Sequence, residues 1–136
     1  MIRLATAGAL LALAACQPEN SPIMRPGEDC LGCHDGARAR KWTLGGTVFS
    51  SATATVDQGV EGVSVTVTDS NNRQLTLSTN GAGNFYTAEG LVPPFLVELG
   101  YQGRSVGMIQ LQQSGACNAC HTDPPQSGAP GRIYTP

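Results

Sequence analysis

Gly62-Val63-Ser64-Val65-Thr66-Val67-Thr68 is the stretch that indicates the fold of this 136-residue chain. Valines alternate here with hydroxylated residues, so an extended strand would present one apolar and one polar face. The alternation returns at Leu75 and Leu77, after the turn sequence Ser70-Asn71-Asn72, and again from Phe95 to Tyr101. This periodicity predicts a β-sheet protein.

Further short segments extend the pattern along the chain. Leu44 to Phe49 opens the series, Asn84-Phe85-Tyr86 follows a glycine-rich turn, and Ser105–Leu111 closes it. Six or seven short strands at this spacing predict a mainly β fold, a small antiparallel β-sandwich over residues 43–112.

The same region resembles the carboxypeptidase regulatory-like, or prealbumin-like, β-sandwich module. The resemblance covers roughly residues 45–110 and rests on Gly46-Thr47-Val48, Gly62–Val67 and Thr79–Phe85. It implies a seven-stranded Greek-key fold with a structural or adhesive role and no catalytic residues of its own.

Two copies of Cys-x-x-Cys-His flank this sandwich, Cys30-Leu31-Gly32-Cys33-His34 and Cys117-Asn118-Ala119-Cys120-His121. They use four of the five cysteines and both histidines of the chain. The spacing is typical of c-type haem attachment, in which both thiols bond to the porphyrin and the histidine is an axial iron ligand. We therefore predict two covalently attached haem c groups, one in each flanking segment (residues 30–42 and 113–136). The predicted attachment residues are Cys30, Cys33, Cys117 and Cys120, and the predicted iron ligands are His34 and His121.

Other functions of such cysteine pairs remain open. Paired Cys-x-x-Cys motifs also form four-cysteine zinc sites and redox disulfides. Zinc ribbons separate their pairs by about 15–20 residues, whereas the whole sandwich lies between Cys33 and Cys117. A zinc site would also leave the repeated histidine unexplained, and the sequence lacks the βαβ context of a thioredoxin-like disulfide.

The second axial ligands must be other than histidine within one chain, because no third histidine exists. Met24 and Met108 each lie upstream of one motif, and methionine sulfur is a common second ligand that raises the potential. Met108 is in phase with Val106 on a predicted strand and could fill the core instead. Lys41, the single lysine, is a third candidate.

The first 15 residues resemble a bacterial lipoprotein signal peptide. A short positive start precedes an apolar stretch, Leu4 to Leu13, that is too short to span a bilayer. It ends at Leu13-Ala14-Ala15-Cys16, which resembles a lipobox; in that family the cysteine is acylated and anchors the protein. Lipidation would explain the leftover thiol of Cys16; a coincidental cysteine at an ordinary secretory cleavage site is the alternative.

Export would place the chain in the cell envelope, and Gln17 after the cysteine favours the outer membrane. Residues 16–29 contain three prolines and are predicted to form an extended tether. The tail from Thr122 to Pro136 is expected to be irregular. An even number of antiparallel strands between the two motifs would place both at one end of the sandwich, and an odd number at opposite ends.

Charge and motif content favour an electron carrier. The formal net charge is −2 and no basic run exists, which argues against a nucleic-acid partner. The whole resembles lipoprotein dihaem cytochromes, with other redox proteins of the envelope as partners. A small haem enzyme would need an open iron and acid–base groups, for which Asp35 and Asp123 are the nearest carboxylates. A non-redox surface module with zinc or disulfide cysteines is the other alternative; self-association stays undetermined.

Overall fold

The computed structural model describes residues 21–136, so the predicted signal peptide and the predicted lipidation site at Cys16 lie outside the described residues. The described chain contains two one-turn helices, α1 (Cys30–Cys33) and α2 (Cys117–Cys120). Its strands are β1 (Leu44–Phe49), β2 (Ser64–Thr68), β3 (Gln74–Ser78), β4 (Asn84–Thr87), β5 (Leu96–Tyr101), β6 (Arg104–Gly107) and β7 (Ile133–Tyr134).

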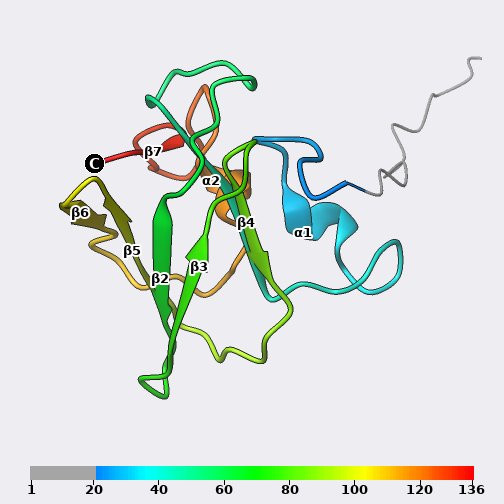
Figure 1. Ribbon diagram of the computed structural model, residues 1–136. Helices are drawn as coiled ribbons and strands as arrows, with labels where there is room; N and C mark the ends of the chain where they lie inside the picture. The colour runs from blue at the N-terminus through cyan, green and yellow to red at the C-terminus, as the bar shows by residue number, and fades with distance from the viewer. Residues whose placement is uncertain (1–20) are drawn as a thin grey trace, which may run out of the picture.

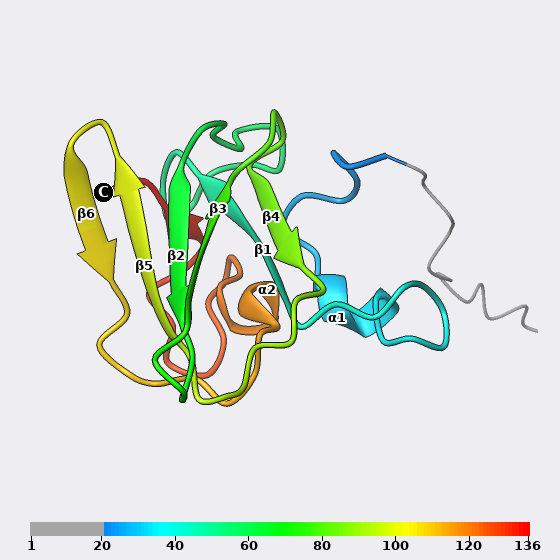
Figure 2. The same ribbon diagram turned by 60° about the horizontal axis from the view of Figure 1, so that its bottom comes forward.

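The strands form two sheets, as Figures 1 and 2 show. One sheet has the order β4-β1-β7 and the other the order β3-β2-β5-β6. Every pair of neighbouring strands is antiparallel except β1 and β7, which are parallel. The predicted mainly β sandwich is confirmed, with one parallel pair that the sequence did not indicate.

The alternation in β2 produces the core. Val63, Val65 and Val67 are fully buried, while the hydroxylated residues between them are half-buried. Val65 pairs with Leu77 of β3 and with Leu99 of β5, so β2 lies inside its sheet. Burying one such side chain contributes about 1.5–3 kcal/mol.

β1 is buried along its whole length. Side chains of a strand point alternately to its two faces. Leu44 and Val48 therefore enter the core, whereas Thr47 and Phe49 point to the outer face. An outer face of a sandwich is usually solvated, so something must cover this one.

Residues 21–29 provide that cover. The sequence predicts an extended tether here, but the segment forms turns that are hydrogen-bonded to the sandwich. The backbone N–H of Gly27 donates to Thr47 Oγ1 at 2.9 Å, and Asn84 Nδ2 donates to the carbonyl oxygen of Met24 at 2.8 Å. A side chain at Gly27 would meet the Phe49 ring at 3.2 Å, so the segment lies directly on β1.

The C-terminal side of the chain also departs from expectation. The strand predicted over Ser105–Leu111 ends at Gly107, and all four residues of β6 are exposed. The tail expected to be irregular contains β7, which pairs with Val48 and Phe49 of β1. Between residues 21 and 136, no helix has the length and apolar character needed to cross a membrane.

Candidate haem-attachment site

The two Cys-x-x-Cys-His motifs adopt the same local structure. In each, the histidine N–H donates to the carbonyl oxygen of the first cysteine, at 2.9 Å for His34 and 3.0 Å for His121. This bond is an i to i−4 helical bond, so each motif is a single α-helical turn that ends at its histidine. The Asp29 carboxylate caps α1 by accepting from the Leu31 N–H at 3.1 Å.

Both imidazoles are held in one orientation by the same kind of contact. His34 Nδ1 lies 2.9 Å from the carbonyl oxygen of Arg40, and His121 Nδ1 lies 3.0 Å from that of Gly131. A carbonyl oxygen only accepts, so Nδ1 carries the proton and Nε2 keeps its lone pair in each neutral ring. Metal-binding histidines are usually oriented in this way. Both histidines therefore fit the role of axial ligand.

The two motifs lie on opposite faces of β1, at neighbouring residues. A Cβ at Gly45 would stand 3.0 Å from Cys30 Cβ, and a Cβ at Gly46 would stand 2.9 Å from Cys117 Cβ. Glycine at both positions lets each cysteine approach the strand this closely. Six strands separate the motifs, and both motifs lie at the beginning of β1 (Figure 2), which agrees with the even-number expectation.

Asn118, inside the second motif, links the two motifs through β1. Its side chain is 2% exposed; Oδ1 accepts from the Thr47 N–H at 3.0 Å. Its Nδ2 donates to Thr47 Oγ1 at 3.0 Å and to the carbonyl oxygen of Glu28 at 2.9 Å. Since Glu28 directly precedes the α1 cap, the Asn118 amide holds both motifs to one strand.

The environment of the cysteines differs between the sulfurs. Burial raises the pKa of the Cys30 thiol to about 11, with a further contribution from Asp29. Burial raises the pKa of the Cys117 thiol to about 12, and the neighbouring Cys30 adds to this. Cys30, Cys117 and Cys120 are free thiols, so neither motif is closed by a disulfide between its own two cysteines.

The zinc alternative gains no support from this arrangement. In residues 21–136, no group of three or more His, Cys, Asp or Glu side chains is placed to hold a metal ion.

A hollow of about 640 Å³ lies between the two motifs. Its lining includes Cys33 of the first motif, Asn118 and Ala119 of the second, and the side chains of Arg25 and Arg38. Both guanidinium groups are paired with carboxylates, Arg25 with Glu28 at 3.2 Å and Arg38 with Asp35 at 3.1 Å. Glu28 and Asp29 also line the hollow, so its lining carries charges of both signs.

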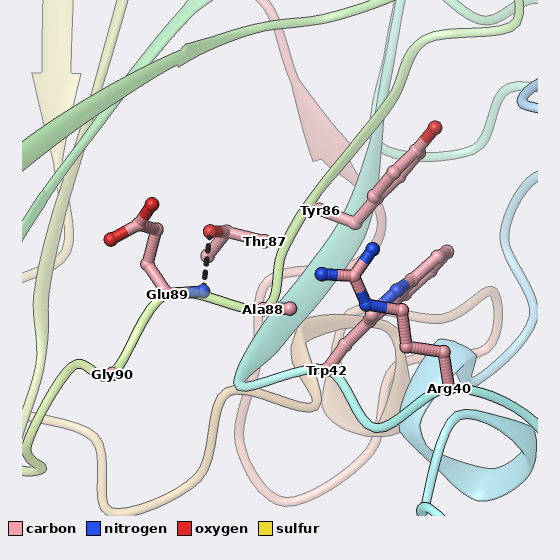
Figure 3. Close-up of a pocket in the computed structure, with 7 residues that line it drawn as sticks. All are labelled: Arg40, Trp42, Tyr86, Thr87, Ala88, Glu89 and Gly90. Carbon is pink, nitrogen blue, oxygen red and sulfur yellow. Dashed lines mark hydrogen bonds between the residues drawn. The ribbon is translucent and has the colours of Figure 1, made fainter.

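The imidazole of His34 also belongs to a stack of three rings. The ring centroids of His34 and Trp42 are 3.4 Å apart with 5° between the planes, and those of Trp42 and Tyr86 are 4.1 Å apart with 4° between the planes. Trp42 and Tyr86 line a second hollow, of about 470 Å³, together with Arg40 and Glu89 (Figure 3).

The candidate second ligands lie in different places. Met24 is half-buried in the segment that covers β1, and its carbonyl oxygen accepts from Asn84 Nδ2. Met108 follows β6 at the edge of the other sheet, where its N–H donates to the carbonyl oxygen of Val97. Figures 1 and 2 show β6 well apart from α2. Val106 is 48% exposed, so the predicted strand face around Met108 does not enter the core.

The remaining candidates have ordinary surroundings. Lys41 is exposed and its side chain lies against Gly36. The Asp35 carboxylate accepts from the N–H groups of Arg38 and Ala37, and these two bonds lower its pKa. Asp123 is exposed.

Sequence reasoning missed Asn118, Thr47, Trp42 and Tyr86. The first occupies a position that the motif leaves unspecified. Trp42 is the single tryptophan and lies inside the predicted first haem segment, which is a signal that could have singled it out.

No family model, curated protein or solved structure matches this chain. The functional conclusion therefore depends on the sequence motifs and on the geometry described above.

Proposed function

We propose that this chain is a dihaem c-type cytochrome that transfers electrons in the cell envelope. The observation that supports it most is the duplicated histidine geometry. Two Cys-x-x-Cys-His turns, far apart in sequence, both bind Nδ1 to a backbone carbonyl and leave Nε2 as the free ligand atom. A structural cysteine turn has no need of that arrangement, whereas an axial iron ligand does.

Each motif would bind one haem through its two cysteines and its histidine. Cys30 and Cys33 would hold one haem c and Cys117 and Cys120 the other, with His34 and His121 as axial ligands. The bound groups would supply one-electron redox chemistry. The sandwich holds both motifs on β1, and the proposal keeps its resemblance to the carboxypeptidase regulatory-like module.

The proposal includes a lipid anchor at Cys16 and a location at the outer membrane. Its partners are other redox proteins of the envelope, and nucleic acid is not among them. Met24 and Met108 are the proposed second ligands within the chain, and an electron-transfer role requires no catalytic residue.

The test is the mass and the colour of protein matured with haem. Intact mass after acid–acetone extraction should retain two haem groups. The pair Cys30→Ser and Cys33→Ser should retain one, and the pair Cys117→Ser and Cys120→Ser should also retain one. Cys16→Ser is the matched control, since it removes the fifth cysteine and should retain both. Extraction that strips the colour would overturn the proposal, and turnover with peroxide would identify an enzyme instead.

A separate measurement tests the second ligands. Ferric protein with methionine sulfur on both irons should show the weak near-infrared charge-transfer band of sulfur ligation at two-site intensity. Met24→Ala and Met108→Ala should each remove part of it. Because Met108 lies at the edge of the other sheet, an unchanged band in Met108→Ala would show that it ligates neither iron.

A further inference from the structure

We propose that Trp42 is a positioning residue that fixes the plane of the His34 imidazole, so that the two haem sites are not equivalent. The inference rests on the proposed function and concerns the orientation of one axial ligand. The residues concerned are His34, Trp42 and Tyr86, whose rings form one stack.

Trp42 is bound to His34 twice. Its backbone N–H donates to the His34 carbonyl oxygen at 3.1 Å, which closes the loop that runs from 35 to 41. Its ring lies 3.4 Å from the imidazole, centroid to centroid, and the planes differ by 5°. The loop therefore starts and ends at a stacked pair of rings.

The stack supplies a constraint that the hydrogen bond lacks. The bond from Nδ1 to the Arg40 carbonyl oxygen fixes the direction of one N–H. The imidazole can still rotate over a limited range about its Cβ–Cγ bond, because a carbonyl accepts over a broad range of directions. A ring parallel to the imidazole removes this freedom. Together the two contacts define the imidazole plane.

Tyr86 connects this plane to the sheet. It lies on β4, directly opposite Gly45 of β1, and its ring stacks on Trp42 with 4° between the planes. Figure 3 shows the Tyr86 and Trp42 side chains side by side, with Arg40 next to them. The stack thus connects the imidazole of His34, through Trp42, to a side chain of β4.

His121 has the hydrogen bond without the stack. Its Nδ1 is bound to the Gly131 carbonyl oxygen, but within residues 21–136 no aromatic ring is stacked on its imidazole. The surroundings of an axial histidine tune the metal that it binds. The first haem should accordingly have a fixed ligand plane, and the second a less constrained one.

Electron paramagnetic resonance of the ferric protein tests this inference, because the low-spin signal depends on the axial ligand plane. The protein that lacks Cys117 and Cys120 assigns the signal of the first haem. Trp42→Leu should shift or broaden that signal and leave the signal of the second haem unchanged. Trp42→Phe should leave the position and width of the first signal nearly unchanged, because the smaller phenyl ring can still stack on the imidazole. Tyr101→Leu, which removes a half-buried tyrosine from the other sheet, is the control and should change neither signal.

Tyr86→Leu provides a second variant in case Trp42→Leu does not fold. It keeps the ring next to His34 and removes the support behind it, so it should broaden the first signal less than Trp42→Leu does. An unchanged first signal in Trp42→Leu and Tyr86→Leu, or equal shifts at both haems, would overturn the inference.

A readout without haem separates this inference from the proposed function. In the full chain produced without haem, the Trp42 ring current should move the His34 ring protons upfield relative to those of His121. Trp42→Leu should abolish the difference. If this shift is present but no haem is attached, the proposed function fails while the stack stands. If haem is attached and the shift is absent, the stack fails alone.

Discussion

Replacing Asn118 by leucine tests whether one amide holds the two cysteine motifs together. Leucine occupies the same position in the first motif, at Leu31, so Asn118→Leu keeps an intact Cys-x-x-Cys-His sequence. Leucine has the same number of side-chain heavy atoms as asparagine and the same branch at Cγ, so the variant removes hydrogen bonds without opening a cavity. The expected effect is a loss of stability with both haem sites still able to form.

The magnitude follows from the three bonds of the Asn118 amide. Thr47 is fully buried, so its N–H is left without a partner, which costs about 1–3 kcal/mol. Thr47 Oγ1 still bonds Gly27 and Asn84, and Glu28 is exposed, so the other two bonds cost about 0.5–1.5 kcal/mol each. The free energy of unfolding should therefore fall by about 2–6 kcal/mol.

Guanidinium unfolding followed by circular dichroism measures this change, as a lower midpoint with an unchanged slope. Ala119→Leu is the matched control, because Ala119 is the exposed neighbour in the same motif and a surface change there should stay within about 0.5 kcal/mol. An Asn118→Leu protein as stable as the Ala119→Leu protein would refute the role of this amide.

Three further predictions concern a glycine, a carboxylate and the anchor. Gly46→Ala should lower the free energy of unfolding by about 1–3 kcal/mol, because its Cβ would stand 2.7 Å from the buried Phe85 ring; Gly90→Ala, at a glycine with open space, is the control. Burial raises the pKa of the Asp69 carboxyl, but three backbone N–H groups that donate to it lower this pKa overall. Its folded pKa is thus below its unfolded value, so the stabilisation is present above about pH 4 and lost as the pH falls through the folded value. Asp69→Asn should flatten this acid loss in unfolding experiments. Cys16→Ser should move the protein from the membrane to the soluble fraction, and an unchanged membrane fraction would contradict lipidation.

The sequence predicts the strands best where one face is buried. β2 shows this, because its valines enter the core and its hydroxylated residues do not. β7 could not be predicted, since two residues carry no periodicity and the pairing comes from β1. The cover over β1 was missed for a similar reason. Residues 21–29 bind mainly through backbone groups, which any polar, proline-containing segment possesses.

In the candidate site, too, the sequence predicts the residues that follow a side-chain pattern and misses the contacts made by backbone groups. The motif spacing locates the cysteines and histidines, because haem attachment requires those residues at that spacing. The partners of His34 and His121 are backbone carbonyls of Arg40 and Gly131, and no side-chain pattern marks a carbonyl. The stack on His34 depends on Tyr86, which reaches it only through the pairing of β4 with β1.

If the chain is exported as proposed, the pairing of β7 with β1 has a consequence for the order in which the two motifs are completed. A chain that crosses a membrane from its N-terminus delivers β1 early and β7 late, and closing so long a loop is a slow step. Until Ile133 and Tyr134 arrive, the edge of β1 that they cover is open, and the Gly131 carbonyl that orients His121 is not yet in place. The first motif can therefore form before the second, whose histidine still lacks the Gly131 carbonyl. If both motifs bind haem as proposed, attachment should therefore proceed from the first motif to the second.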